Sequence, residues 1–236
     1  MSKINKAILD FQMLEDNDYI AVGLSGGKDS LVLIHTLAKL KEYSKISFNL
    51  IAIHLDLGFP KEDFSLILDF LKELKVECQI VKTEIYQILQ KNLTNDGHLP
   101  CSLCSKFKKA LVIEEATKLK YNKVAFAHHG DDAIETIVLN ALYGGRLATF
   151  RPKMYLTRSK MTFIRPLIYV REKEISNYAN INKLPVLISS CPNDGNTKRA
   201  EVKELLNKLY LKYPDAYHNL LIMLSNTKKV DLWDKE

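Results

Sequence analysis

Short apolar runs alternate with helical patterns over the first two-thirds of the chain. A run of about four to eight apolar residues between turn residues is typical of a buried strand, and apolar positions with a period of about 3.6 residues are typical of a helix. Strands are predicted at residues 19–24, 48–55, 78–82 and 123–127. Helices are predicted at about residues 28–42, 61–74, 107–119 and 131–143. This alternation predicts an α/β fold that has a mainly parallel sheet with helices on both faces.

The pattern changes beyond Gly144 and Gly145. A basic and less regular stretch, residues 146–165, leads to Pro166. Helical patterns then return at about residues 171–182, at 197–211 and from 214 onward. We therefore predict one domain over residues 1–236, in which about 166–236 form a small helical C-terminal extension.

Length and composition are those of a globular protein. The 236 residues include 47% apolar residues, which is enough for the core of one α/β domain. No apolar run approaches the roughly 18–20 residues that span a bilayer, and no apolar segment typical of a secretory signal follows Met1. We expect a cytoplasmic protein without membrane association. The formal net charge of +6 is compatible with RNA as a partner but does not by itself indicate one.

A glycine-rich loop, Ser25-Gly26-Gly27-Lys28-Asp29-Ser30, joins the first predicted strand to the first predicted helix. Ligands of parallel sheets bind at the carboxyl ends of the strands. Two glycines let backbone N–H groups approach an anion, and the helix N-terminus, Lys28 and two hydroxyls add to its binding. The P-loop of common NTPases has a longer spacing and Ser or Thr after its lysine, whereas Asp29 follows here. The loop therefore indicates another kind of phosphate site, or a turn that binds no ligand.

The six-residue loop resembles the SGGKDS signature of the PP-loop ATP pyrophosphatases. This resemblance implies a PP-loop fold in which the loop holds the pyrophosphate of ATP while AMP passes to an acceptor. The residues that it assigns to nucleotide binding are Leu24, Ser25, Gly26, Gly27, Lys28, Asp29 and Ser30.

Cysteines are the second candidate chemistry. Cys101 and Cys104 form one C-x-x-C, a weak signal for which zinc, a redox pair and coincidence compete. Structural zinc normally takes four ligands, and no second pair exists here. Cys78 lies in a predicted strand and is expected to be a buried small residue, whereas Cys191 lies in a turn-rich loop that can present a ligand. Three thiolates also fit an iron–sulfur cluster with one open iron, and spacing alone leaves cluster and zinc equally favoured.

The segment around the C-x-x-C resembles one group within the PP-loop enzymes. Residues 100–110, PCSLCSKFKKA, look like the corresponding region of the tRNA 2-thiocytidine synthetase group. Further matching segments are residues 127–136, 143–145, 164–167 and 171–175, so that the resemblance covers roughly residues 18–212. It implies a [4Fe–4S] cluster held by Cys101, Cys104 and Cys191.

Two positions depart from that group's pattern. Cys191 is followed by Pro-Asn-Asp where members often have a second C-x-x-C, and Lys108-Lys109 stands in place of two arginines. Neither change removes a predicted cluster ligand. Lysine cannot make the bidentate contacts of arginine, so contacts with the substrate are expected to differ there.

The motif His128-His129-Gly130-Asp131-Asp132 follows the last predicted strand. Its carboxylates suit a metal ion, and they equally suit the start of a helix, where acidic residues are favoured. The resemblance implies that Asp132 is catalytic and that Lys108 is its basic partner. It also implies that His54 and Ala127 flank the adenosine and that Leu103 lies close by.

The resemblance predicts an ATP-dependent tRNA sulfurtransferase that adenylates a pyrimidine C2 oxygen, that of cytidine, and replaces it with sulfur. The implied cofactors are ATP, Mg²⁺ and a [4Fe–4S] cluster. The implied partners are tRNA and a sulfur donor such as a cysteine desulfurase system or free sulfide, and a homodimer is compatible with the resemblance. The basic residues between 146 and 171 are candidates for contact with the tRNA backbone, and a solvated loop explains them equally well. Two alternatives stay open: a tRNA lysidine synthetase or related ligase that uses nitrogen, and a non-catalytic nucleotide- or RNA-binding module with structural zinc.

Overall fold

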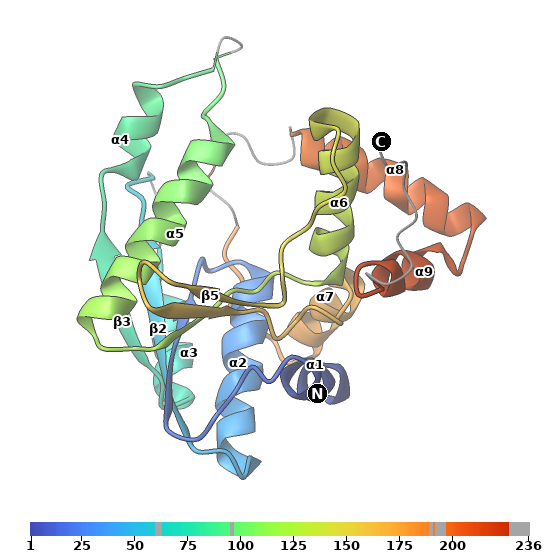
Figure 1. Cartoon of the computed structure of the whole chain (residues 1–236). Coiled ribbons are helices and arrows are strands. Elements are labelled where there is room, and N and C mark those ends of the chain that lie inside the picture. Colours follow the sequence, from blue (N-terminus) through green and yellow to red (C-terminus); the bar gives the residue numbers. More distant parts are fainter. Residues whose placement is uncertain (60–62, 95–96, 189–190, 192–196, 227–236) are drawn as a thin grey trace. The chain divides into compact units, whose positions relative to one another are not determined.

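The computed structural model of the chain describes residues 1–59, 63–94, 97–188, 191 and 197–226 (Figure 1). Contacts between Cα atoms divide the chain into two compact units. The first unit comprises Met1–His129 and Pro152–Asp194, and the second comprises Gly130–Arg151 and Gly195–Glu236. The single domain expected over residues 1–236 remains a prediction, because a division into compact units does not decide it.

A six-stranded sheet forms the centre of the first unit. Its strands are β1 (Asp18–Gly23), β2 (Phe48–Asp56), β3 (Glu77–Lys82), β4 (Lys123–Ala125), β5 (Lys153–Leu156) and β6 (Met161–Ile164). The strand order is β3-β2-β1-β4-β6-β5, and every neighbouring pair is parallel except β5 and β6. The mainly parallel sheet predicted from the sequence is confirmed.

Helices of the first unit connect and cover these strands. They are α1 (Ser2–Asp10), α2 (Lys28–Tyr43), α3 (Ser65–Glu73), α4 (Ile85–Gln90), α5 (Cys101–Lys118) and α7 (Glu172–Ile181). The second unit contains α6 (Gly130–Gly144), α8 (Lys198–Lys212) and α9 (Ala216–Met223). In the part of the chain that the structure describes, no helix combines the length and hydropathy of a membrane span.

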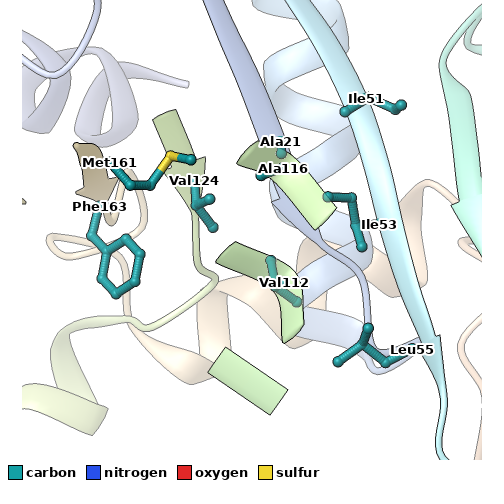
Figure 2. Close-up of a cluster of buried hydrophobic side chains, with 9 residues drawn as sticks. All are labelled: Ala21, Ile51, Ile53, Leu55, Val112, Ala116, Val124, Met161 and Phe163. Carbon is teal, nitrogen blue, oxygen red and sulfur yellow. The ribbon is translucent and has the colours of Figure 1, made fainter. Parts of the chain in front are cut away.

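The core of the first unit follows from the alternation of side chains along the strands. Figure 2 shows Ala21 of β1 and alternate residues of β2 on the same side as Val112 and Ala116 of α5. Ile20 and Val22 point to the opposite face and are also fully buried. Helix α2, of which ten of sixteen residues are buried, packs against β1 and β2. Both faces of the sheet are therefore covered, as predicted.

The amino ends of β1 and β4 are joined by a buried ion pair. Lys123 Nζ lies 2.7 Å from Asp18 Oδ2, and both residues are almost fully buried, at 4% and 3% exposure. The Asp18 carboxylate also accepts hydrogen bonds from Asn122 Nδ2 and from the backbone N–H of Glu15, and Lys123 donates to the carbonyl of Met13. A buried pair with its remaining hydrogen bonds satisfied ties the two strands together.

Several boundaries differ from those predicted. Helix α5 begins at Cys101 and not near residue 107, which places the C-x-x-C inside its first turn. The stretch 146–165, expected to be less regular, contains the antiparallel pair β5 and β6. Each of these strands has four residues, too few for a recognisable alternation, and helices α1 and α4 were not predicted either. The first residues of the helix predicted at 61–74 lie outside the described residues, and α3 starts at Ser65.

Candidate active site

The glycine-rich loop lies between β1 and α2, at the carboxyl end of the strand. Its two serines hold it in shape: Ser25 Oγ and Ser30 Oγ lie 3.2 Å apart, and the Ser25 N–H donates to Ser30 Oγ. Ser30 Oγ also donates to the carbonyl of Gly27, the residue that caps the amino end of α2. The loop therefore turns directly into the helix N-terminus, where the backbone N–H groups and the helix dipole favour an anion.

Gly26 explains why the loop needs glycine. Its φ is +79°, a conformation that side chains disfavour, and a Cβ there would lie 2.8 Å from Leu187 Cδ1. The Leu187 N–H donates to the carbonyl of Gly26 at 3.0 Å. The segment after α7 thus packs closely on the loop, a contact that the sequence did not reveal.

The ammonium group of Lys28 lies between two carboxylates. Its Nζ is 3.0 Å from Glu172 Oε1 and 3.4 Å from Asp29 Oδ1. Burial by itself lowers the pKa of Lys28, but the charges of Asp29 and Glu172 and their hydrogen bonds outweigh it and raise this pKa above its ordinary value. The Lys28 side chain is 30% exposed, so oxygens of an incoming anion can replace those of the carboxylates.

His54 stands at the end of the neighbouring strand β2. Its Nδ1 lies 3.0 Å from the carbonyl oxygen of Leu24, and because a carbonyl only accepts, Nδ1 carries the proton and donates. The buried ring stacks on Phe64, with centroids 3.7 Å apart. His54 therefore fixes Leu24, the residue that leads into the phosphate loop. Its place beside an adenosine remains a prediction.

The first two cysteines lie one turn apart on α5, which Pro100 precedes as the N-cap. At this spacing Cys101 and Cys104 project from the same side of the helix. Cys101 is exposed and Cys104 is half-buried. Two thiols at the exposed start of a helix are well placed to act as ligands, because the helix N-terminus favours thiolates.

The structure brings Cys191 and Lys108 to the same place. Burial raises the pKa of the Cys104 thiol; the positive charge of Lys108 opposes this shift, and the nearby Cys191 and Cys101 add to it. Lys108 follows Cys104 by one turn of α5, and its charge acts on the Cys104 thiol. Cys101 and Cys191 therefore both lie within electrostatic range of Cys104. Within the described residues, no group of three or more histidine, cysteine or acidic side chains is drawn together as closely as a bound metal ion requires.

Leu103 and Ala127, which were predicted to lie near the adenosine, and the fourth cysteine, Cys78, also belong to the first unit. Leu103 lies in the first turn of α5 and packs with Cys104 against the buried cluster of Ile85, Leu89 and Leu99. Ala127 follows β4 and is half-buried. Cys78 lies in β3, as predicted, and burial raises the pKa of its thiol to about 11.

Asp132 belongs to the second unit, whereas all the other predicted site residues belong to the first. It lies with Asp131 in the first turn of α6, the position that favours carboxylates. Its Oδ1 accepts a hydrogen bond at 3.1 Å from Arg199 Nη1 of α8. The reading of these carboxylates as residues at a helix start is therefore confirmed, and their catalytic role stays a prediction.

Three contacts of the candidate site escaped the sequence analysis: Glu172 on Lys28, Leu187 on Gly26 and Arg199 on Asp132. Each joins residues far apart in the chain, by 144 positions for Lys28 and Glu172 and by 67 for Asp132 and Arg199. Glu172 lies in the matched segment 171–175, to which the resemblance assigns no function. The partners in these three contacts meet only in the folded chain.

Comparison with known proteins agrees with this geometry. A family model for the PP-loop domain matches residues 1–209. A tRNA-cytidine(32) 2-sulfurtransferase from Paraburkholderia xenovorans is 35% identical over 98% of this chain and 69% of its own length. One from Aliivibrio fischeri is 37% identical over 97% of this chain and 74% of its own. One from Pelobacter propionicus is 36% identical over 99% of this chain and 87% of its own length.

A solved structure has the same fold. The U34-tRNA thiolase NcsA from Methanococcus maripaludis, determined with its [4Fe-4S] cluster, superposes with a TM-score of 0.76. The alignment covers 98% of this chain and 79% of NcsA, at 24% sequence identity. The chain therefore belongs to the PP-loop family, in the branch whose curated members are named tRNA-cytidine(32) 2-sulfurtransferases.

Proposed function

We propose that the chain is an ATP-dependent tRNA sulfurtransferase that converts a cytidine, at position 32 as in the names of its relatives, to 2-thiocytidine. The C2 oxygen attacks the α-phosphorus of ATP, and the bond from that phosphorus to the bridging oxygen of the β-phosphate breaks. Sulfide then adds at C2 and loses its proton, and the C2–O bond breaks, so that AMP carries away the original oxygen. Adenylation is necessary because a bare oxide is too poor a leaving group.

The phosphate loop performs the first half of this reaction. Backbone N–H groups at the start of α2 bind the pyrophosphate, and Lys28 exchanges its carboxylate partners for phosphate oxygens. These groups stabilise charge that develops on the departing pyrophosphate, which is electrostatic catalysis by preplaced donors. Mg²⁺ bound with ATP supplies further positive charge to the phosphates.

The cysteines provide the second half. Cys101 and Cys191 both lie within electrostatic range of Cys104, and three thiols are the donor chemistry that would hold a [4Fe–4S] cluster with one iron left open. The cluster, when bound, supplies a site at which sulfide is held for transfer. Zinc fits less well, because three thiols leave a structural site one ligand short.

Two charged residues complete the proposed chemistry. Lys108 stabilises negative charge that develops on the adenylated base, and its charge acts on the Cys104 thiol, so that its ammonium group lies near the sulfur site. Asp132 orients Mg²⁺ or accepts a proton. We assign the sulfur to free sulfide or a cysteine desulfurase system and the reaction to the cytoplasm, where thiols stay reduced.

The gathering of Cys101, Cys191 and Lys108 around Cys104 is the observation that carries this proposal. Every PP-loop enzyme needs the phosphate loop, but a ligase that uses nitrogen has no use for three matched thiols. The cysteines therefore select sulfur as the atom transferred.

The test is an anaerobic reconstitution with tRNA, ATP, Mg²⁺ and sulfide, followed by mass spectrometry of the nucleosides and measurement of AMP. We expect AMP and 2-thiocytidine in equal amounts, and loss of 2-thiocytidine in Cys101→Ala and Cys191→Ala. Cys78→Ala is the matched control, since Cys78 is a half-buried residue of β3, and should retain activity.

The same assay separates the alternatives. A colourless anaerobic preparation that lacks iron and acid-labile sulfide, yet forms AMP with tRNA, would support a nitrogen-using ligase. A protein that binds zinc and forms no AMP would support the non-catalytic module.

A further inference from the structure

A single guanidinium group binds one side of the helix that carries Asp132. Arg199 Nη1 donates to Asp132 Oδ1 at 3.1 Å, and Nη2 donates to Thr136 Oγ1 at 3.2 Å. Its Nε lies 3.8 Å from Oε2 of Glu135, a buried residue. Residues three and four positions apart share a face of a helix, so one planar group reaches all three side chains.

Arg199 is itself held in place. It is in the first turn of α8, where Thr197 caps the helix by accepting a hydrogen bond from the N–H of Ala200. Further along, Val202 and Leu206 pack with Ile134 of α6 in the buried cluster of the second unit. The guanidinium therefore starts from a fixed backbone on a helix packed against α6.

Two neighbours of Arg199 also reach back to α6. Lys198 Nζ lies 4.4 Å from the centre of the Tyr143 ring, and Tyr143 Oη donates to Glu201 Oε2 at 3.4 Å. These exposed contacts add little stability individually, and they come from the same first turn of α8 as Arg199.

Partial burial of Asp132 distinguishes its pair with Arg199 from a pair between two exposed side chains. The Asp132 side chain is 19% exposed and that of Arg199 is 45% exposed, whereas Lys208 and Glu204, farther along α8, are 72% and 69% exposed. A bond that is partly shielded from water, with a second donor anchored on Thr136, restricts the carboxylate to one orientation.

We propose that Arg199 is a positioning residue, which holds the Asp132 carboxylate in the orientation that the adenylation step requires. The inference rests on the proposed function, and in particular on Asp132 taking part in the reaction. It gives the C-terminal part of the chain a task in catalysis, because α8 supplies the group that orients Asp132.

The primary test is the rate of AMP formation with tRNA and sulfide in Arg199→Met. We expect kcat to fall by about 100-fold, the size of loss that a misplaced catalytic group causes, with the KM for ATP unchanged. Arg199→Lys keeps the charge but lacks the planar fork, so its loss should be smaller, about tenfold. Lys208→Met breaks the exposed pair with Glu204 and should leave kcat unchanged. A wild-type kcat in Arg199→Met would overturn the inference.

A double-mutant comparison distinguishes positioning from structural support. In Asp132→Asn, addition of Arg199→Met should cause no further loss of kcat, because Arg199 acts through Asp132. Arg199→Met should still lower the melting temperature of Asp132→Asn, because it also removes the contacts of Arg199 with Thr136 and Glu135. Losses of kcat that multiply in the double variant would overturn the inference and assign Arg199 a direct contact with substrate.

The experiments distinguish failure of the proposed function from failure of the inference about Arg199. If wild-type protein forms AMP and 2-thiocytidine while Asp132→Asn does so at the same rate, the function stands and the inference is overturned. If wild-type protein forms neither product, the proposed function fails before any variant is compared, and the inference is overturned with it.

Discussion

The two ends of strands β1 and β4 use the same kinds of residue for different purposes. At the amino ends, Lys123 and Asp18 form a buried pair at 2.7 Å whose remaining hydrogen bonds are satisfied. At the carboxyl end of β1, Lys28 is half-buried and has two carboxylate partners at 3.0 and 3.4 Å. A closed pair can only hold the fold together, whereas a partly exposed lysine can exchange its partners for a ligand. Burial and completeness of bonding, and not residue type, distinguish the structural end from the functional end.

The largest effect is expected when the closed pair is broken. Lys123→Met leaves the Asp18 carboxylate buried without its cation, which should lower the free energy of unfolding by about 3–5 kcal/mol. Urea denaturation followed by circular dichroism measures this loss. Lys118→Met is the matched control, because it breaks an exposed pair with Glu114 and should cost about 1 kcal/mol or less. Equal losses in the two variants would erase the contrast between the ends of the sheet.

Loss of the lysine at the functional end should affect activity far more than the fold. Lys28→Ala removes the charge that stabilises departing pyrophosphate, and we expect AMP formation to fall by about 10²–10³-fold. The urea midpoint should fall only slightly, because the ion pairs that are lost are partly exposed. Lys3→Ala, which breaks the exposed pair with Glu174, serves as the control with normal activity. Retained AMP formation in Lys28→Ala would mean that the loop is not the pyrophosphate site.

A smaller effect is expected from the loop backbone. Gly26→Ala combines strain at a φ of +79° with a clash against Leu187, and should cost about 1–3 kcal/mol of stability. Gly97→Ala shares the positive φ of its glycine, but a Cβ there meets no atom within 4 Å, so it should cost less. Leu187→Ala should partly rescue Gly26→Ala in thermal melts. Absence of rescue would argue against the close contact between the loop and the segment after α7.

The smallest effect concerns exchange of the Lys28 partners. The raised pKa of Lys28 means that its pairing stabilises the fold at neutral pH, and that this contribution is lost only when the pH rises through the raised value. Glu172→Gln removes one competitor for the ammonium group. Pyrophosphate measured by calorimetry at pH 7 should then bind at most about fivefold more tightly, as a partly exposed pair allows. Weaker binding would show that Glu172 assists the anion and does not compete with it.

The sequence predicts those parts of the site that are continuous in the chain. The loop from Ser25 to Ser30, the C-x-x-C and the acidic start of α6 are short motifs at the ends of predicted elements, and the structure places each of them there. The long apolar strands could also be predicted from the sequence, because apolar runs and the turn residues that flank them are local signals.

The parts that could not be predicted depend on folding. The hairpin of β5 and β6 consists of strands too short to show a period, and β5 gains its place only as the edge of the sheet. Glu172, Leu187 and Arg199 are ordinary residues of their helices or loops, and only tertiary structure makes them partners of Lys28, Gly26 and Asp132. Single-sequence patterns carry no signal for such pairs.

The most direct measurement of the central claim is mass spectrometry of tRNA nucleosides from cells that carry or lack this protein. The account predicts that 2-thiocytidine disappears when the protein is absent, returns with the wild-type chain, and does not return with Lys28→Ala or Cys191→Ala. Unchanged 2-thiocytidine in cells without the protein, with no other redundant source of this nucleoside, would contradict it.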